Sequence, residues 1–585
     1  MFPRSADPLR GYPEQGNDFF LLAFSFSMSA TILSLLAARV DADAELPAIS
    51  FRRDGAWQTR PWSALADDVR RTAAVLVELG ATPGDRVAQV SPNRYEWIVA
   101  DLAIQMACAV HVPVHATLAA PQIAFQIIDS GARVVLLSGV DLAAKLATYS
   151  EADGAAPFPA ELKFVSFDPC PRPVGPFKVA LLADLTGHVD PTEARRTEEA
   201  ASRHVGPDDL ATILYTSGTT GEPKGVMLSQ RNLASNALAT LEAFCQQSSD
   251  LRLAWLPLSH IFARTCDLYT SIAGGCQIAL ADSPEQVTAN CRELHPTLIN
   301  GVPYFYEKVM RYLVDHQLAD LPGALATAFG GRLRAACSGG APLPDHVTRF
   351  YNERGVFLAQ GYGLTESSPV ITLGTPTAMK IGTVGRPAPG VEVKISDEGE
   401  IVTRGPHVML GYWNKPEATA EAFRDGWLRT GDLGELDAEG FLTITGRKKE
   451  LIVTSAGKKI APVHVEALLT ADPLIERAVV IGDRRGYLVA LVIPNHEALA
   501  AELARLGIQL ASSADVCTHA GVLAIYRQRI DERLAGVSQY EQVGKFTLLE
   551  QPLSIERGEL TLTLKLRRQA IEANYAEVIE RMYRT

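Results

Sequence analysis

Small hydroxyl residues, glycines and a lysine stand together near the middle of the chain in a pattern suited to binding phosphate. The sequence reads Leu-Tyr-Thr-Ser-Gly-Thr-Thr-Gly-Glu-Pro-Lys-Gly-Val from Leu214 to Val226. Small residues let successive backbone N–H groups turn toward an anion, hydroxyls donate hydrogen bonds, and the lysine supplies a mobile positive charge. The pattern predicts a phosphate-binding loop made by Thr216, Ser217, Gly218, Thr219, Thr220, Gly221 and Lys224.

The spacing of this loop sets it apart from the Walker loop. That loop needs Gly-x4-Gly-Lys-Ser/Thr running into a helix, and the segment has a different spacing. A flexible surface loop is the other interpretation, because Gly, Ser and Thr commonly form turns. An apolar run at residues 210–215, which predicts a buried strand, and the Pro-Lys-Gly after the loop argue against it.

Further motifs follow the loop, and together they resemble one enzyme superfamily. They are Ser338-Gly-Gly-Ala-Pro342, Gln360-Gly-Tyr-Gly-Leu-Thr-Glu366, Gly426-Trp-Leu-Arg-Thr-Gly-Asp432, Gly440-Phe-Leu-Thr-Ile-Thr-Gly-Arg447 and Gly558-Glu-Leu-Thr-Leu-Thr-Leu-Lys565-Leu-Arg-Arg568. In type and order they resemble the adenylate-forming superfamily of acyl-CoA synthetases, peptide-synthetase adenylation domains and firefly-type luciferases. The resemblance covers roughly residues 47–575.

The resemblance implies a site for ATP and Mg²⁺. In similar enzymes the residue matching Tyr362 stacks on adenine, and the one matching Thr365 touches the α-phosphate. Glu366, with Thr216, would hold magnesium, because a hard cation prefers carboxylate oxygen and bridges to substrate phosphates. The other implied nucleotide contacts are Gly339, Gly340 and Ala341 at the adenine, Gly363 beside it, and Asp432 and Arg447 at the ribose.

The resemblance also implies a pocket for an acyl chain. His260, which ends the run Trp255-Leu-Pro-Leu-Ser-His260, and Tyr304, in the apolar run at 300–306, would line it. Such a wall suits a long hydrocarbon, since each buried methylene contributes about 0.8 kcal/mol. Without the resemblance, a lone histidine is more often a structural hydrogen-bonding group, and an aromatic run more often fills a core.

Three residues near the C-terminus complete the implied machinery. Lys449 matches the hinge about which the small C-terminal domain of the superfamily rotates. Lys565 would lie between the carboxylate and the α-phosphate, and Gly457 would leave room for the pantetheine arm of coenzyme A. The segment around Lys565 resembles the long-chain type, and its one departure is Leu562, where the family more usually has proline.

Alternating strands and helices are expected to carry these motifs. Between residues 47 and 139 the pattern predicts helices at 62–79, 95–107 and 120–130 and strands at 86–90, 109–113 and 134–137. This alternation is typical of an α/β fold with parallel strands. Residues 151–206 are weakly periodic and are expected to form a surface excursion, and a strand is expected at 333–337.

The expected architecture is α/β, with a large N-terminal domain of α/β subdomains, a small β-barrel-like subdomain and a small mobile α+β C-terminal domain. A chain of 585 residues exceeds what one hydrophobic core usually supports. We expect an N-terminal extension and first helix at 1–40, the large AMP-binding domain at 41–447 and the C-terminal domain at 448–585. Helices are expected at 463–469 and 499–506 in the last of these.

Composition limits the partners and the compartment. The net charge of −12 provides no broad basic field, which argues against nucleic acid as a partner. The eight cysteines form no CxxC pair, as expected of reduced thiols in a cytoplasm. Residues 19–38 carry no charge and are long enough to span a bilayer. Their Ser, Thr and Ala content, and the mixed charges before them, favour an extension ahead of a helix at 30–40, with Met28 as an alternative start.

The sequence therefore predicts a cytoplasmic acid:CoA ligase that activates medium-to-long fatty acids in two steps, using ATP, Mg²⁺ and coenzyme A. An acyl-AMP ligase that passes the acyl group to a carrier protein is the nearest alternative. A non-catalytic nucleotide- or lipid-binding paralogue is the alternative from another class, and the joint presence of Lys224, Glu366, Asp432, Arg447 and Lys565 opposes it. The sequence leaves open a homodimer and a peripheral contact with the inner membrane.

Overall fold

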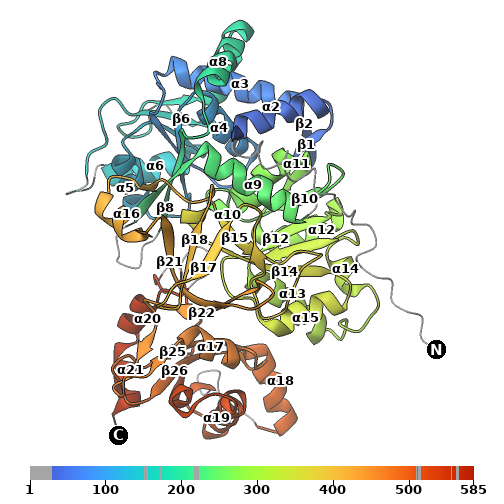
Figure 1. Cartoon of the computed structure of the whole chain (residues 1–585), viewed down its shortest axis with the longest axis vertical. Coiled ribbons are helices and arrows are strands. Elements are labelled where there is room, and N and C mark those ends of the chain that lie inside the picture. Colours follow the sequence, from blue (N-terminus) through green and yellow to red (C-terminus); the bar gives the residue numbers. More distant parts are fainter. Residues whose placement is uncertain are drawn as a thin grey trace. The chain divides into compact units, whose positions relative to one another are not determined.

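A computed structural model (Figure 1) describes most of the chain. The described residues are 29–150, 152, 154, 156–170, 173–216, 223–244, 246–508, 510, 516–554, 557–560 and 566–584. They form two compact units. The first runs to Gly340 and adds Thr348–Lys394 and Val402–Arg429, and the second consists of Ala341–Val347, Ile395–Ile401 and the chain from Thr430 onward.

An eight-stranded sheet of the first unit carries the strand that leads into the phosphate loop. Its order is β19-β9-β8-β4-β3-β5-β6-β7, and β3 pairs in parallel with both β4 and β5. Strand β8 is parallel to β4 and antiparallel to β9. The bounds are β3 Arg86–Val90, β4 Val110–Val114, β5 Ala132–Leu137, β6 Lys163–Ser166, β7 Val179–Leu181, β8 Leu210–Thr216, β9 Lys224–Ser229 and β19 Gly411–Tyr412.

A nine-stranded sheet of the same unit carries the expected adenine and acyl segments. Its order is β16-β15-β14-β13-β12-β10-β11-β1-β2, with a parallel centre from β14 to β1 and antiparallel edges. The bounds are β1 Pro47–Arg53, β2 Ala56–Pro61, β10 Leu251–Ala254, β11 Gln277–Leu280, β12 Leu298–Gly301, β13 Ala335–Ser338, β14 Phe357–Gly363, β15 Val370–Leu373 and β16 Arg386–Pro387.

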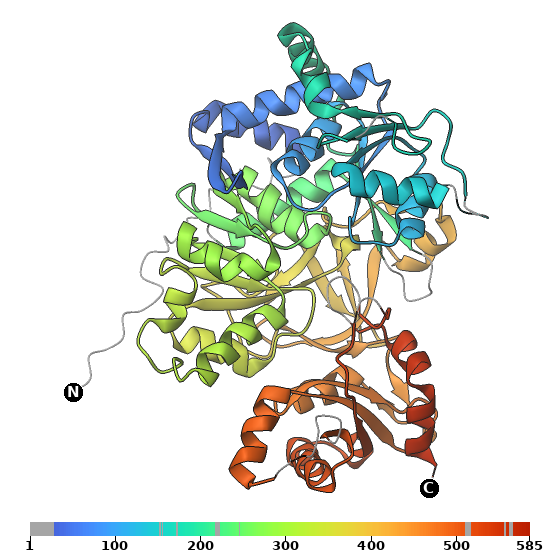
Figure 2. The ribbon, with the colours of Figure 1, turned by 180° about the vertical axis from the view of Figure 1, so that it is seen from behind.

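Helices pack on these sheets through apolar faces. Helix α3 (Trp62–Glu78) buries residues three and four positions apart, including Leu65, Val69 and Leu76, which is the pattern of an amphipathic helix. Every residue of α4 (Tyr95–Met106) except Glu96 is buried, as expected of a helix apolar on all sides. Helix α2 (Ile32–Asp43) packs on α3, and both are drawn in blue in Figures 1 and 2.

The other helices mostly connect the strands of the two sheets. Their bounds are α5 Ala120–Ser130, α6 Gly139–Ser150, α7 Leu182–Gly187, α8 Pro191–His204, α9 Gln230–Phe244, α10 Ile261–Ala263, α11 Thr270–Gly274, α12 Val287–Leu294, α13 Pro303–Asp315, α14 Ala324–Ala328, α15 Asp345–Glu353 and α16 Pro416–Ala422. A π-helical turn, η1 (Arg264–Tyr269), joins α10 to α11, and η2 (Pro284–Gln286) and η3 (Thr365–Ser367) are short 3₁₀ turns.

A third sheet has five strands and lies where the small β-rich subdomain is expected. Its order is β17-β18-β21-β20, with β22 paired to β21. The bounds are β17 Glu392–Ile395, β18 Glu400–Arg404, β20 Phe423–Arg424, β21 Trp427–Leu436 and β22 Leu442–Arg447.

The C-terminal part of the second unit is an α+β arrangement. A three-stranded sheet, β25-β26-β27, has an apolar core on each face, and β26 is buried along its whole length. The strands are β23 Ile452–Val453, β24 Lys459–Ile460, β25 Ile475–Ile481, β26 Leu488–Pro494 and β27 Val543–Leu548. The helices are α17 Pro462–Thr470, α18 His496–Leu506, α19 Ala520–Leu534, α20 Arg568–Asn574 and α21 Ala576–Tyr583, with a 3₁₀ turn η5 at Gln539–Glu541.

The predicted α/β class, with a separate α+β C-terminal domain, is confirmed, and one local prediction is wrong. Residues 151–206 contribute β6 and β7 to the edge of the eight-stranded sheet and form α7 and α8. Their periodicity is weak because both strands are short and because α8 buries only the small side chains Ala194, Thr197 and Ala201. Within the described part of the chain, none of the helices combines the length and apolar character needed to cross a membrane.

Candidate active site

The two ends of the predicted phosphate loop are held together by a β-hairpin. Thr216 ends β8, Lys224 begins β9, and these two residues are paired across the hairpin. The Thr216 hydroxyl lies 3.5 Å from the Lys224 carbonyl oxygen. The predicted loop residues Ser217, Gly218, Thr219, Thr220 and Gly221 lie outside the described residues. The hairpin therefore defines where the loop leaves and rejoins the sheet.

A tyrosine brings the loop lysine and the predicted magnesium ligand into one cluster. The Lys224 ammonium lies 4.9 Å from the centre of the Tyr412 ring. The Tyr412 hydroxyl donates a 2.8 Å hydrogen bond to Glu366 Oε1. Burial and the neighbouring Glu366 carboxylate raise the pKa of Tyr412, so the phenol stays protonated and can donate at neutral pH. A cation, a hydroxyl and a carboxylate thus lie together in the first unit.

Helix α9 fixes the segments that carry this cluster. The Asn232 amide donates to the carbonyl oxygens of Pro406 and Val408, at 2.7 and 2.8 Å. The Asn236 side chain both donates to and accepts from the backbone of Val370 on β15. The Met409 N–H donates to the Glu366 carbonyl oxygen at 2.9 Å. Buried amides in this role satisfy backbone groups that no strand partner reaches.

The predicted adenine residues lie directly after β13 and at the end of β14, which are adjacent parallel strands. Gly363 has no room for a side chain, because an added Cβ would lie 1.7 Å from the Pro369 carbonyl oxygen. A Cβ on Gly339 would lie 2.9 Å from the ring of Phe262, and Gly340 has a φ of +82°. Tyr362 is half-buried on β14. The Phe262 ring thus lies against Gly339, a contact that the sequence motifs did not single out.

Thr365 and Glu366 share the 3₁₀ turn η3, directly after the adenine segment. The Ser367 hydroxyl donates to the carbonyl oxygens of Leu364 and Pro369, at 3.0 and 2.6 Å. These contacts tie the turn to the start of β15. The turn therefore presents the predicted phosphate and magnesium residues from a backbone anchored at both ends.

The two predicted pocket residues have different surroundings. His260 caps α10, and its Nδ1 atom accepts from the Phe262 N–H at 3.2 Å. Strand β10 ends at Ala254, so His260 lies in the connection after the strand and not at its end. Tyr304 is 42% exposed on α13, while its neighbours Phe305 and Tyr306 are buried. The aromatic run therefore mainly fills the core.

The two predicted ribose residues meet in the second unit. Asp432 on β21 pairs across the hairpin with Arg447 on β22, and Arg447 Nε lies 2.8 Å from Asp432 Oδ1. The Asp432 side chain is nearly fully buried, and the backbone N–H of Asp432 donates to the Thr430 hydroxyl at 3.1 Å. Hairpin register alone brings together two motifs that the sequence separates. Ala341, from the adenine motif, also belongs to this unit.

Lys449, the predicted hinge, is exposed in a turn between two ion-paired neighbours. Lys448 contacts Glu398, and it lies 3.4 Å from Glu400. Glu450 lies 3.3 Å from Arg568 Nε. Arg568 also pairs with Glu466 at 2.5 Å, and both side chains are largely buried.

The remaining predictions concern the coenzyme A step and the catalytic lysine. Gly457 lies in the turn between β23 and β24 with a φ of +74°, and an added Cβ would meet no atom within 4 Å. Lys565 lies outside the described residues. Its segment is followed directly by Leu566, which bridges to Leu560.

Magnesium is compatible with the residues at Glu366. One oxygen of the carboxylate accepts from Tyr412, and the second can serve a cation. No cluster of three or more His, Cys, Asp or Glu side chains able to hold a metal occurs among the described residues. One carboxylate is enough for Mg²⁺ when substrate phosphates and waters provide the other oxygens.

Two protein-family models match most of the chain. The family model "AMP-binding enzyme" matches residues 36–413, and the model "AMP-binding enzyme C-terminal domain" matches residues 449–585. The chain therefore belongs to the AMP-binding, adenylate-forming enzyme superfamily, and the resemblance inferred from the motifs is confirmed.

Relatives in this superfamily extend over nearly the whole chain. The chain is 35% identical over 573 residues to the long-chain-fatty-acid–CoA ligase FadD15 of Mycobacterium tuberculosis, covering 91% of this chain and 93% of the relative. It is 29% identical to the long-chain-fatty-acid–CoA ligase ACSBG1 of Bos taurus, with 94% and 85% covered.

Solved structures share the fold. ATP-bound MatB from Rhodopseudomonas palustris matches with a TM-score of 0.73 at 24% identity, covering 94% of this chain and all of that one. A Mycobacterium tuberculosis fatty acyl CoA synthetase matches with a TM-score of 0.66 at 24% identity, covering 94% and 99%.

Proposed function

We propose that this protein is an acid–thiol ligase that converts a medium- or long-chain fatty acid to its acyl-CoA. In the first step a carboxylate oxygen bonds to the α-phosphorus of ATP, and the bond to the β-phosphate oxygen breaks, which releases pyrophosphate and leaves acyl-adenylate. In the second step the sulfur of coenzyme A bonds to the acyl carbon, AMP leaves, and the thiol proton passes to solvent. The observation that carries the proposal is the cluster of Lys224, Tyr412 and Glu366 at the end of the phosphate-loop hairpin.

The chain's own residues contribute position and charge, and none is needed as a covalent nucleophile. Lys224 and Thr216, with the loop between them, bind the β- and γ-phosphates. Thr365 contacts the α-phosphate, and Tyr362 stacks on adenine. Groups held ready for the charge that develops in a transition state commonly supply the largest share of catalysis.

Tyr412 has a positioning role in this scheme. By donating to Glu366 Oε1 it fixes the carboxylate, and its ring limits where the Lys224 ammonium can lie. Magnesium, when bound, would be held by Glu366 and Thr216 and would neutralise charge on the phosphates. The carboxylate needs no other protein acid for this work.

The second unit supplies the remaining roles in the proposal. Asp432 and Arg447, already paired, would contact the ribose hydroxyls, since a carboxylate accepts from two hydroxyls at once. Lys565 would stabilise charge at the α-phosphate in the first step. Lys449 would act as the hinge and Gly457 would admit coenzyme A in the second, within domains at 41–447 and 448–585.

The long-chain preference rests on the relatives and on the C-terminal motif. Both relatives above are long-chain-fatty-acid–CoA ligases by name. His260 and Tyr304 are the proposed pocket residues, with Phe262 added from the geometry at Gly339. The cysteine pattern favours a cytoplasmic enzyme.

Pyrophosphate release measured over C2 to C20 acids, with and without coenzyme A, tests the proposal. We expect release with medium- and long-chain acids and formation of acyl-CoA when the thiol is present. Release without acyl-CoA, followed by acylation of an added carrier protein, would identify an acyl-AMP ligase. Absence of release with every acid would leave a non-catalytic paralogue, and preference for acetate or benzoate over palmitate and dodecanoate would refute the chain-length assignment.

A further inference from the structure

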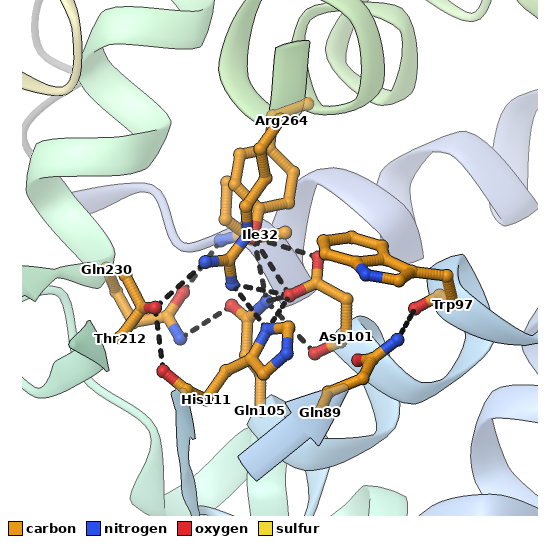
Figure 3. Close-up of polar contacts among 10 residues, drawn as sticks. Ile32, Gln89, Trp97, Asp101, Gln105, His111, Thr212, Gln230 and Arg264 are labelled. Atoms are coloured by element: carbon orange, nitrogen blue, oxygen red, sulfur yellow. Dashed lines mark hydrogen bonds and ion pairs between the residues drawn. The ribbon is translucent and has the colours of Figure 1, made fainter. Parts of the chain in front are cut away.

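A network of buried polar side chains in the first unit joins β8, β4 and α4 to the π-helical turn η1 (Figure 3). We call this set of residues the buried network: Asp101, Gln105, His111, Thr212, Gln230, Arg264 and Tyr269. Each of these side chains is at most 2% exposed. An ion pair so deeply buried contributes little net stability compared with apolar packing of the same volume. We therefore infer that the buried Asp101–Arg264 pair fixes the geometry of the elements that it joins.

The Arg264 guanidinium is the centre of the buried network. Its Nη2 atom lies 2.5 Å from Asp101 Oδ1 on α4, and its Nε donates to the Tyr269 hydroxyl at 2.7 Å. Its Nη1 atom donates to the Thr212 hydroxyl on β8 at 2.8 Å. A planar fork of N–H donors holds its partners in fixed directions, which a lysine would not do.

Arg264 belongs to the π-helical turn that directly follows His260 and Phe262. The turn, Arg264–Tyr269, is entirely buried, and both the N–H and the hydroxyl of Thr270 contact the Thr265 carbonyl oxygen. Single π-helical turns are costly and occur frequently at functional sites. Phe262, two residues before Arg264, packs where a side chain on Gly339 would lie.

The same turn carries a second buried charge that faces the other sheet. Asp267 lies 3.2 Å from Arg252 on β10 and accepts from the Asn300 amide on β12 at 2.7 Å. Arg264 therefore ties the turn to the eight-stranded sheet, and Asp267 ties it to the nine-stranded sheet. Two opposite charges on one turn determine its position from two sides.

Through Thr212 the buried network reaches the strand that ends in the phosphate loop. Thr212 stands four positions before Thr216 on β8, and its hydroxyl also donates to the His111 carbonyl oxygen on β4 at 2.7 Å. Arg264 thus lies in the π-helical turn after the pocket segment, and its guanidinium contacts β8, the strand before the phosphate loop. Rigid, packed elements linked in this way transmit small displacements.

We propose that Arg264 is a positioning residue for adenylation, which couples strand β8, ending at Thr216, to the pocket segment at His260 and Phe262. Only the predicted effect on adenylation kinetics rests on the proposed function; the structural coupling does not depend on it. Arg264 touches neither substrate in this proposal. It acts through Thr212 on one side and through the π-helical turn on the other.

The test compares one hydrogen bond inside this coupling with an equally buried one outside it. Thr212→Val removes the acceptor for Arg264 and keeps the side-chain shape, and Thr212→Ser keeps the hydroxyl. The matched control is Ser166→Ala, because Ser166 on β6 is fully buried and its hydroxyl donates to the Asp168 carbonyl oxygen, outside the network. Tyr269→Phe, which breaks the link on the turn side, is the second probe if Thr212→Val does not fold.

Three measurements are made on the full chain: pyrophosphate release with separate KM values for ATP and fatty acid, the unfolding free energy, and hydrogen exchange of residues 210–216 and 261–274. Thr212→Val should lower kcat/KM for ATP by about tenfold, because small misplacements of a reacting group are costly, and it should speed exchange in both segments. Thr212→Ser should restore both quantities. Ser166→Ala should lower stability with wild-type kinetics and without faster exchange at 261–274.

Equal kinetic losses in Thr212→Val and Ser166→Ala would overturn the proposal, as would faster exchange confined to 210–216. A wild-type protein that releases no pyrophosphate with any acid would instead refute the proposed function. In that case the exchange comparison still decides the coupling, because it requires no turnover.

Discussion

The buried network around Arg264 and the ion pairs beside Lys449 both consist of charged side chains, but they differ in their exposure to water. Arg264 and Asp101 are fully buried, and Arg264 also contacts three further polar side chains, those of Tyr269, Thr212 and His111. Lys448 and its partner Glu398 have side chains that are 37% and 50% exposed. The first set of contacts is shielded from water, and the second is open to water and salt.

This difference determines what each region can do. Breaking a buried pair leaves an uncompensated charge in the core, whereas an exposed pair exchanges its partner for water at little cost. The buried network therefore suits a part of the site that must hold its geometry. The exposed Lys448 pair suits the hinge proposed at Lys449, where contacts would be remade when the C-terminal domain turns, and the Arg568–Glu466 pair nearby is largely buried.

The largest predicted contrast is in stability. Arg264→Met should lower the unfolding free energy by about 3–5 kcal/mol, because Asp101 remains buried without its partner. Lys448→Met, a matched loss of one cation, should cost about 0.2–1 kcal/mol, since Lys448 and Glu398 are both partly exposed and the nearly buried Glu400 keeps a hydrogen bond from the Gly431 N–H. Urea unfolding of both variants checks this. Similar losses of unfolding free energy in the two variants would contradict this contrast. A double variant Arg264→Met/Asp101→Leu that regains stability would show that the unpaired carboxylate causes the loss.

The second prediction separates the two half-reactions. Lys565→Ala should lower acyl-adenylate formation by about 10²–10³-fold, as removal of one electrostatic stabiliser usually does, yet still convert supplied acyl-adenylate to acyl-CoA. Gly457→Leu and Lys449→Pro should spare adenylation and impair thioester formation, because they act at the predicted thiol entry and at the hinge. Both half-reactions are assayed for all three variants after circular dichroism confirms folding.

Equal damage to both steps by Lys565→Ala would count against alternating orientations of the C-terminal domain. Loss of adenylation alone in Gly457→Leu would do the same.

The third prediction concerns the Lys224, Tyr412 and Glu366 cluster. Glu366→Gln should lower adenylation by about 10²-fold, because the charge that holds magnesium is lost. Tyr412→Phe should have a smaller effect, since only the orientation of the carboxylate changes. Rates at limiting magnesium measure both, and a near-wild-type Glu366→Gln enzyme would contradict the assignment.

The last prediction concerns the pH dependence of stability in the first unit, where each variant changes one slope. Burial lowers the pKa of His111, His115 and His407 to about 4, below the ordinary value of 6.5. Between these values the unfolded chain holds protons that the folded chain does not, so stability is lost as pH falls from 6.5 to 4. Each such group contributes up to about 1.4 kcal/mol per pH unit.

Asp267 opposes this slope, because burial raises its pKa from 3.8 to about 6 and its contribution falls as pH rises through that window. His407→Gln should therefore flatten the rise of unfolding free energy between pH 4.5 and 6.5, and Asp267→Asn should steepen it. Unfolding curves at several pH values measure both slopes. An unchanged slope in His407→Gln would show that this histidine is protonated in the fold.

Much of the fold follows from local patterns. The helix predicted at 120–130 and the strand predicted at 86–90 match α5 and β3 residue for residue, because amphipathic spacing and short apolar runs report directly on burial. The elements in 151–206 were not predictable in this way. Their burial uses small side chains and short edge strands, which leave little periodic signal.

By itself the sequence determined the superfamily, the α/β class and the motifs that carry chemistry, because these depend on residue type, order and spacing. Only the tertiary structure decided which side chains meet. Tyr412 lies between Lys224 and Glu366, Phe262 lies against Gly339, and Arg264 joins β8 to the π-helical turn. Such contacts join residues far apart in the chain. They depend on strand register and on helix packing, and no local propensity encodes either.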